Sequence, residues 1–312
     1  MADQYRHINV QKMPGTVGVE LSGFDVSKSL SDEVFEEIRR AFIDNYLIVV
    51  RDQNLTPETL CAFAARFGPL TKTPFLTPKN GHPYVVSLIR EATTDKSIPV
   101  VGGRWHSDGA FMEETPLGSM LYAVEVPPEG GDTHFVSLQR AYDSLSPGMK
   151  KLAEQLFIMN YPTVFDKDRE KEVPNIWKGN LTYEMNEGGP STMTELAQPL
   201  VCYHPESGRK LLRLAGFYSV RFKDMTEEES APLMKYFQSI IIQQDFVSTV
   251  KWTKGTVILW DNRAVQHRVD NNYPGYRREM WRVQIGGPKL VGPVNEKAPS
   301  HQDASQEAVA LS

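Results

Sequence analysis

Two residue types that ligate metals stand two positions apart in the segment Trp105-His106-Ser107-Asp108. In an extended backbone, residues i and i+2 project to the same face, so one imidazole and one carboxylate can hold a cation from one side. Such a pair alone occurs often by chance. A third candidate ligand is His267, which a loop after the apolar segment ending at Trp260 could return to the pair. Two histidines and one carboxylate leave other coordination positions open, as in non-haem Fe(II) oxygenases.

Two arginines that follow His267 suit an acidic ligand. Arg278 lies eleven positions after His267 (278 − 267), and Arg282 lies four further on, where a strand would place both side chains on one face. A guanidinium matches a carboxylate with parallel hydrogen bonds, as a 2-oxo acid with a second carboxylate requires. One arginine is expected to hold this cosubstrate, and the other either helps it or binds an anionic substrate. We expect Arg277 at a solvated strand edge.

The elements that must position these residues are mostly short strands. Helices are expected to begin at Ser31, Thr56, Ser146 and Thr226, where a capping residue precedes an apolar face. The turn at 206–208 predicts a hairpin between two of the strands. The pattern favours a mixed α+β, mainly β fold, a sandwich or barrel with flanking helices. Alternating or apolar segments predict the strands over 8–10, 17–21, 46–50, 120–124, 134–136, 200–203, 211–214, 256–260 and 279–285.

Composition excludes several classes of protein. The 312 residues are 40% hydrophobic and 23% charged, typical of a globular protein with a real core. The net charge of −5 argues against non-specific nucleic-acid binding. The two cysteines, Cys61 and Cys202, lie too far apart in the sequence for a ligand motif and predict no disulfide framework. Neither a signal peptide nor a membrane span is predicted, so we expect a cytoplasmic protein.

The chain is expected to form a single catalytic domain over residues 1–291. The polar segment near 165–198 is expected to be a lid insert, since loops of this length are usually functional or disordered. The polar tail at 292–312 is expected to be disordered. Apolar contacts from the lid to a substrate are expected from Phe165, Trp177, Tyr183 and Met185.

Four separately placed motifs resemble those of the taurine dioxygenase / 2,4-dichlorophenoxyacetate dioxygenase family. Trp105–Phe111 resembles the His-x-Asp motif of the family, and Gly130-Gly131-Asp132-Thr133 resembles its Gly-Gly-Asp/Gln-Thr turn. The remaining two match its C-terminal signature in order and spacing: Trp260-Asp261-Asn262-Arg263 through His267, and then Arg278 with Arg282. The resemblance covers residues 17–287, nearly the whole chain.

The resemblance implies a double-stranded β-helix (jelly-roll) core that binds Fe(II) through His106, Asp108 and His267. It implies that Thr133 and Arg278 hold the distal carboxylate of 2-oxoglutarate. The implied reaction consumes 2-oxoglutarate and O2, releases succinate and CO2, and oxidises a small organic substrate. In this reaction the oxidising power belongs to the metal centre, and the protein supplies orientation and protection.

The residues expected to bind the substrate differ from those of taurine enzymes at two positions. Where taurine enzymes place an Asn four residues before the metal His, this chain has Gly102, and the family's sulfonate-binding His is replaced near Thr73. Arg282 matches the family arginine that contacts the substrate anion. The expected substrate is therefore an acid: a sulfonate, an aryloxy or alkyl acid, or an alkyl sulfate. The substrate pocket is expected to include Phe75, Gly102, Phe111, Met112, Phe217 and Arg282.

These features leave three candidate functions. The first is hydroxylation of such a small acid. The second is the same iron centre acting in natural-product biosynthesis on a bulkier apolar intermediate, by hydroxylation, desaturation or ring modification. The third is a non-catalytic jelly-roll binding protein, which would have no need of the complete ligand and cosubstrate set. A zinc hydrolase is disfavoured because no general base is evident beside a metal-bound water. The expected partners are a small-molecule substrate and further copies of the chain, as a dimer or tetramer.

Overall fold

A large antiparallel-rich sheet forms one layer of the protein in the computed structural model, which describes residues 5–73, 76–162 and 194–294. Its central strands are antiparallel and largely buried, because both faces of the sheet are covered. In spatial order the strands are β1 (Asn9–Lys12), β2 (Val19–Ser22), β3 (Leu47–Val50), β14 (Val257–Asp261), β6 (Gly118–Glu125), β16 (Arg278–Ile285) and β4 (Leu70–Thr71), and β5 (Val85–Arg90) also pairs with β16.

A three-stranded sheet forms the second layer, with β13 (Ser248–Val250), β7 (Thr133–Ser137) and β15 (Val265–Val269) in that order. The two layers share one hydrophobic core, to which β6 and β14 contribute from one side and β7 and β15 from the other. Phe135 of β7 meets Trp260 of β14 across this core, with ring centroids 5.8 Å apart. The metal-ligand candidates lie at this junction between the sheets.

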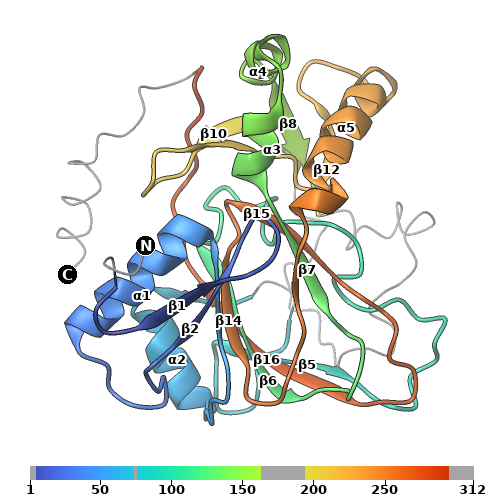
Figure 1. Cartoon of the computed structure of the whole chain (residues 1–312). Coiled ribbons are helices and arrows are strands. Elements are labelled where there is room, and N and C mark those ends of the chain that lie inside the picture. The colour runs from blue at the N-terminus through green and yellow to red at the C-terminus, as the bar shows by residue number, and fades with distance from the viewer. Residues whose placement is uncertain (1–4, 74–75, 163–193, 295–312) are drawn as a thin grey trace.

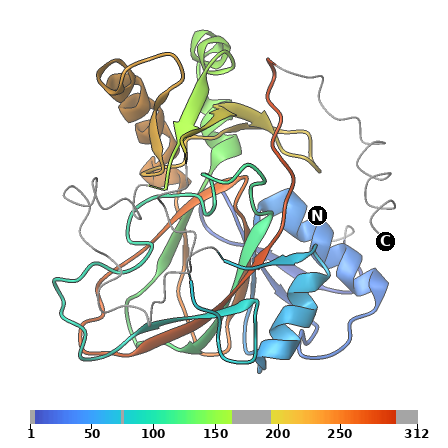
Figure 2. The same cartoon turned by 180° about the vertical axis from the view of Figure 1, so that it is seen from behind.

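Two helices cover the outer face of the large sheet (Figures 1 and 2). Helix α1 (Asp32–Asn45) begins at the cap Ser31, and α2 (Pro57–Ala65) begins at Thr56 with Pro57 at its first position, as the sequence predicts. Their apolar faces pack on β3, β6 and β14 in a second core that includes Phe42, Leu60 and Met120. The sheet is therefore held rigid from outside.

The remaining elements gather at one end of the molecule, the top in Figure 1. The predicted hairpin is present as β10 (Val201–Tyr203) paired with β11 (Lys210–Leu212). Of the predicted lid segment, residues 196–198 pair with β8 as part of β9, and residues 165–193 lie outside the described residues, so the lid stays a prediction. The further elements are α3 (Leu138–Ser144), α4 (Pro147–Ala153), β8 (Phe157–Asn160), β9 (Leu196–Pro199), β12 (Ser219–Phe222), α5 (Glu227–Ile241) and the 3-10 turn η4 (Gln244–Phe246).

The predicted mixed, mainly β class with flanking helices is confirmed. Both cysteines are free, also as predicted, and burial raises the pKa of the Cys202 thiol to about 11, which makes it unreactive at neutral pH. Within the described part of the chain, no helix has the length and apolar character needed to cross a membrane.

Candidate metal centre

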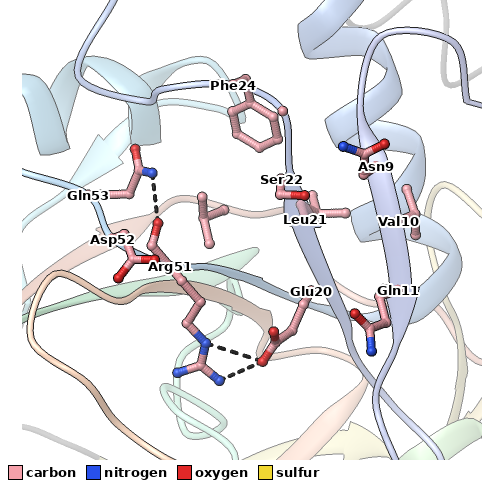
Figure 3. A pocket seen from close by; sticks show the side chains of 12 residues that line it. Asn9, Val10, Gln11, Glu20, Leu21, Ser22, Phe24, Arg51, Asp52 and Gln53 are labelled. Atoms are coloured by element: carbon pink, nitrogen blue, oxygen red, sulfur yellow. Dashed lines mark hydrogen bonds and ion pairs between the residues drawn. The ribbon is translucent and has the colours of Figure 1, made fainter.

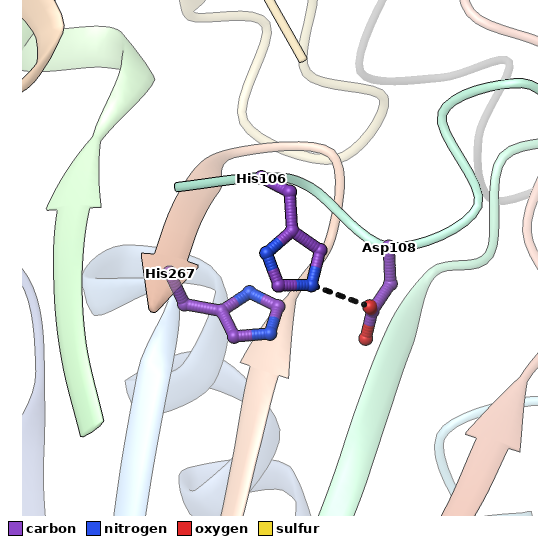
Figure 4. Close-up of side chains that lie close together, drawn as sticks. All are labelled: His106, Asp108 and His267. Carbon is purple, nitrogen blue, oxygen red and sulfur yellow. Dashed lines mark ion pairs between the residues drawn. The ribbon is translucent and has the colours of Figure 1, made fainter. Parts of the chain in front are cut away.

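His106 and His267 are 161 positions apart (267 − 106) but lie on paired backbones. The N–H of each donates to the carbonyl of the other, over 3.1 Å and 2.8 Å, in an isolated antiparallel bridge. Ser107 strengthens this pairing through its hydroxyl, which donates to the Val265 carbonyl at 2.7 Å. The ring centroids of the two histidines are consequently 4.3 Å apart (Figure 4). The turn at 262–264, directly after β14, returns the chain to this pair as expected, and His267 is the central residue of the strand that follows, β15.

Each histidine presents a nitrogen that suits a metal. His106 Nδ1 donates to the Arg104 carbonyl at 2.7 Å, which leaves its Nε2 with a lone pair. His267 is buried, and its Nδ1 has no hydrogen-bond partner among the described residues. Burial, reinforced by the nearby His106, lowers the pKa of His267 to about 3. His267 is therefore neutral at physiological pH, as metal binding requires.

Asp108 is held by two partners on one of its oxygens. Its Oδ2 accepts from the Ser119 hydroxyl at 2.8 Å and from Arg282 Nη2 at 2.9 Å, and Asn262 donates to the same Ser119 oxygen at 3.0 Å. The other oxygen, Oδ1, lies 3.4 Å from His106 Nε2. Burial alone would raise the pKa of Asp108, but the Arg282 charge together with the adjacent His267 and His106 outweighs it and holds the pKa well below the usual range. The carboxylate is therefore ionised.

The three side chains fit a divalent metal. One ligand atom from each of His106, Asp108 and His267 lies within 4.8 Å of the others, and no second such group occurs among the described residues. Two neutral imidazoles and one ionised carboxylate, with other positions open, are the donor set of mononuclear non-haem iron. The predicted ligand set is thus brought together in one buried place.

Ser119 positions Asp108, so Ser119→Ala is expected to weaken divalent-metal affinity by about 10-fold or more, the usual effect of removing a partner of a metal ligand. The matched control is Ser230→Ala on α5, which removes an equally buried hydroxyl that bonds only backbone and lies away from the candidate ligands. Titration of both variants with Mn(II), followed by electron paramagnetic resonance, checks this. Equal loss in the two variants would show that Ser119 matters only for folding.

A fully buried ion pair shapes the turn that leads into β15. Asp261 ends β14 and accepts from Arg263 Nε at 2.8 Å and from its backbone N–H at 2.9 Å, and His204 Nε2 lies 2.9 Å from the other carboxylate oxygen. Burial would raise the pKa of Asp261, yet the Arg263 guanidinium outweighs it and holds that pKa well below its usual value. The turn is therefore fixed by an ionised carboxylate.

Removing this charge leaves the buried Arg263 with Glu206, 2.9 Å from its Nη1, as its remaining ion-pair partner, so Asp261→Asn is expected to destabilise the fold by about 3 kcal/mol, the lower end for a broken buried pair. Because the folded-state pKa is depressed, the stabilisation is present above the ordinary pKa of 3.8 and is lost as the pH falls below it. Urea unfolding between pH 6 and pH 3 should therefore show a shallower acid loss in the variant than in the wild type. Parallel curves, or an equal effect of the exposed control Asp224→Asn, would contradict this.

The residues expected to bind the cosubstrate meet around a tryptophan. Thr133 is the first residue of β7, and its hydroxyl oxygen accepts from Trp252 Nε1 at 2.9 Å, which leaves the hydroxyl hydrogen free to donate. The Arg278 guanidinium carbon lies 5.7 Å from the centroid of the Trp252 ring. Burial lowers the pKa of Arg278, and its Nε has no partner among the described residues. Among the described residues, no carboxylate pairs with Arg278.

Aromatic side chains border the histidines on the side of the expected substrate pocket. The Phe217 ring lies 5.2 Å from that of His106, and Tyr218 lies 5.0 Å from Phe111. Gly102 is also brought to His106: a side-chain carbon there would lie 3.5 Å from the imidazole Cε1, and the φ of +79° favours glycine.

Two other residues predicted to line the substrate pocket, Met112 and Phe75, are not placed there by the described contacts. The described contacts of Met112 are made by its backbone, which bonds Gly109 and Gln198, so they do not place it with the aromatic group. Phe75 lies outside the described residues, as do the four lid residues of the sequence prediction.

Three side chains of the site were missed from the sequence. Ser119 and Trp252 have no local signal, because each meets its partner, Asp108 or Thr133, only in the folded chain. Arg104 does have a local signal in the sequence, because it stands two positions before His106 and an extended segment places both side chains on the same side. Its guanidinium carbon lies 4.9 Å from the Phe217 ring centroid, and burial lowers its pKa.

A separate hollow of about 240 Å³ lies on strands β1, β2 and β3 (Figure 3). Across it Arg51 and Glu20 pair with each other at 2.6 Å, and Gln53 bonds backbone at Arg51 and Val26. It shares no residue with the candidate metal centre, and its principal polar groups are already satisfied.

The fold and the two-histidine, one-carboxylate site together define a class of mononuclear metal enzymes, and comparison with known proteins identifies the family. The family described as taurine catabolism dioxygenase TauD, TfdA matches residues 9–284, and the chain belongs to it. Membership confirms the predicted class of enzyme, a dioxygenase and thus an oxidoreductase. It also supports the predicted dependence on 2-oxoglutarate, which the names of several curated relatives state.

Similar proteins cover nearly the whole chain. An alkylsulfatase from Acinetobacter baylyi is 27% identical over 92% of this chain and 87% of its own. An alpha-ketoglutarate-dependent 2,4-dichlorophenoxyacetate dioxygenase from Cupriavidus pinatubonensis is 30% identical over 85% of this chain and 92% of its own. The solved structure of a taurine dioxygenase from Burkholderia xenovorans matches with a TM-score of 0.77 and 26% identity, covering 96% of this chain and 98% of that one.

Proposed function

We propose that the protein is an Fe(II)- and 2-oxoglutarate-dependent dioxygenase that hydroxylates a small organic acid and releases succinate and CO2. The observation that carries the proposal is the buried triad of His106, Asp108 and His267, with its ligand atoms within 4.8 Å of one another. When bound, iron with 2-oxoglutarate and O2 would supply the oxidising power. The chain supplies two neutral imidazoles, one ionised carboxylate and a site largely closed to water.

The cosubstrate half of the proposal rests on Thr133 and Arg278. Both are buried, and both have hydrogen-bond donors without an acceptor among the described residues. A carboxylate satisfies several donors at once and offsets the buried charge of Arg278. Arg282, which already bonds Asp108 through Nη2, has a buried Nε without a partner and can serve the metal-proximal end of the same ligand.

The substrate class follows from charge and shape near His106. Arg104 forms no ion pair with any described residue and lies over Phe217, so it offers a cation beside an aromatic surface. The resemblance to the family puts Thr73 near the position of the sulfonate-binding His, and its buried hydroxyl has no partner in the described part of the chain. An organic anion with an apolar body fits these groups. Relatives of the chain include an alpha-ketoglutarate-dependent sulfate ester dioxygenase from Pseudomonas putida and the 2,4-dichlorophenoxyacetate dioxygenase named above. We therefore propose an alkyl sulfate, a sulfonate or an aryloxy or alkyl acid.

The proposal is tested by reconstituting the protein with Fe(II) and 2-oxoglutarate under air and measuring succinate against a panel. The panel pairs each alkyl sulfate, sulfonate and aryloxy acid with an uncharged ester or alcohol of the same size. Substrate-dependent succinate with the acids, and an oxygenated product by mass spectrometry, is the expected result. Failure to bind iron or to turn over would overturn the proposal. Coupling only with uncharged apolar compounds, with desaturated or ring-modified products, would favour the biosynthetic alternative.

Three further predictions belong with this function. We propose that the two facing sheets form the double-stranded β-helix of the family, because β6 and β14 pack against β7 and β15 around one core. A cytoplasmic location and a homo-oligomer, dimer or tetramer, stay predictions. Gel filtration with light scattering measures the oligomeric state directly.

A further inference from the structure

Two arginines face each other at the cosubstrate end of the site. Arg278 of β16 is directly opposite Arg90 of β5 in the antiparallel register, and both residues are buried. Like charges opposite each other on neighbouring strands repel, and a buried cation is costly without an anion. Arg90 donates to the carbonyls of Asp95 and Ile98, and no described residue forms an ion pair with Arg278. Arg278 therefore brings a buried positive charge to this corner.

Tyr273 lies in the same corner with an unused hydroxyl. The residue is only 3% exposed, and its hydroxyl has no hydrogen-bond partner among the described residues. Burial raises its pKa, an effect that the charges of Arg278 and Arg90 reduce without reversing. The phenol is consequently protonated at neutral pH and able to donate. A buried hydroxyl without an acceptor is unfavourable unless a ligand supplies one.

Gly131 shows how closely these groups converge. A side-chain carbon at Gly131 would lie 3.1 Å from Cδ1 and 3.2 Å from Cε1 of Tyr273, and 3.5 Å from Nε of Arg278. The Gly131 N–H is fixed by the side-chain oxygen of Asn272 at 2.8 Å, and Thr133 follows two residues later. The phenol ring and the guanidinium thus share one small volume, bounded by the turn that delivers the Thr133 hydroxyl.

We infer that the Tyr273 hydroxyl donates a hydrogen bond to the distal carboxylate of 2-oxoglutarate, beside Arg278 and Thr133. The inference rests on the proposed function. Three donors that lack acceptors, from Tyr273, Arg278 and Thr133, then share the two oxygens of one carboxylate, which has about four acceptor positions. Tyr273 thereby helps the enzyme select a 2-oxo acid that has a second carboxylate at its far end.

Tyr273→Phe tests this by removing one hydroxyl and keeping the ring. In the Mn(II)-loaded protein, calorimetric titration should show 2-oxoglutarate binding weakened about 10- to 100-fold, the effect of losing a hydrogen bond to a charged group. Binding of 2-oxopentanoate, which has the same carbon chain without the distal carboxylate, should change less than about 2-fold. The melting temperature of the unliganded variant should stay equal or rise, because an unsatisfied buried hydroxyl is lost. The control Tyr276→Phe, at an exposed residue, should change none of these quantities.

The outcomes separate this inference from the proposed function. Wild-type protein that binds Mn(II) but no 2-oxoglutarate would overturn both. Unchanged 2-oxoglutarate affinity in Tyr273→Phe, with normal wild-type binding, would overturn only the role of Tyr273. Equal weakening of 2-oxoglutarate and 2-oxopentanoate, together with a lower melting temperature, would make Tyr273 a structural residue and would also overturn the inference.

Discussion

His106→Ala is expected to abolish iron-dependent succinate release and to weaken divalent-metal binding by more than about 100-fold, beyond the usual effect of losing a residue that only supports a ligand. Only Asp108 and His267 would remain to hold the ion. The backbone bridge between positions 106 and 267 uses N–H and carbonyl groups, which alanine keeps, so the fold around the site should survive. Mn(II) titration, with circular dichroism to establish folding, measures the two effects separately.

The matched control for this experiment is His82→Ala. His82 is a partly exposed histidine that lies near Glu58 on α2, away from the metal centre, so this variant should keep wild-type metal affinity and turnover. A folded His106→Ala protein that still binds metal with wild-type affinity would refute the ligand assignment. Loss of activity without loss of metal would instead indicate a role for His106 other than ligation.

Arg278→Ala has the second largest expected effect, a rise in the apparent KM for 2-oxoglutarate of about 30-fold to more than 1000-fold. This range corresponds to the 2–5 kcal/mol typical of truncating one partner of a buried charged pair. Metal affinity should stay near wild type, because Arg278 contacts Trp252 and not the three ligands. Stability without cosubstrate should not fall, since the repulsion between Arg278 and Arg90 is relieved. Steady-state kinetics, Mn(II) titration and thermal unfolding give the three values.

Arg277→Ala is the neighbouring control. Arg277 directly precedes β16 and is partly exposed, and it pairs there with Glu91, Glu125 and Glu279. Exposed ion pairs contribute little, so its removal should leave the KM for 2-oxoglutarate nearly unchanged. If Arg278→Ala behaved like Arg277→Ala, the distal carboxylate would have to be held elsewhere.

Several features of this protein depend only on residues close together in the chain, and for these the sequence was sufficient. The His106–Asp108 pair shares a face because an extended backbone alternates its side chains. The caps at Ser31, Thr56 and Thr226 begin helices because their side chains accept from backbone N–H groups three residues on. The apolar run from Val257 to Trp260 was recognisable as a buried strand for the same local reason.

Other features were decided by the pairing of distant strands. His267 lies in a strand because β15 pairs with β7, although its polar sequence has no clear strand pattern. Trp252 follows β13, whose pairing with β7 brings it to Thr133, and Ser119 of β6 meets Asp108, eleven positions away, only in the folded chain. Each of these polar side chains could bond many partners in an unfolded chain, and only the packed sheets select one. The sequence by itself therefore determined the class of enzyme and its candidate metal ligands, whereas the tertiary structure decided which side chains orient those candidates and which buried donors have no acceptor among the described residues.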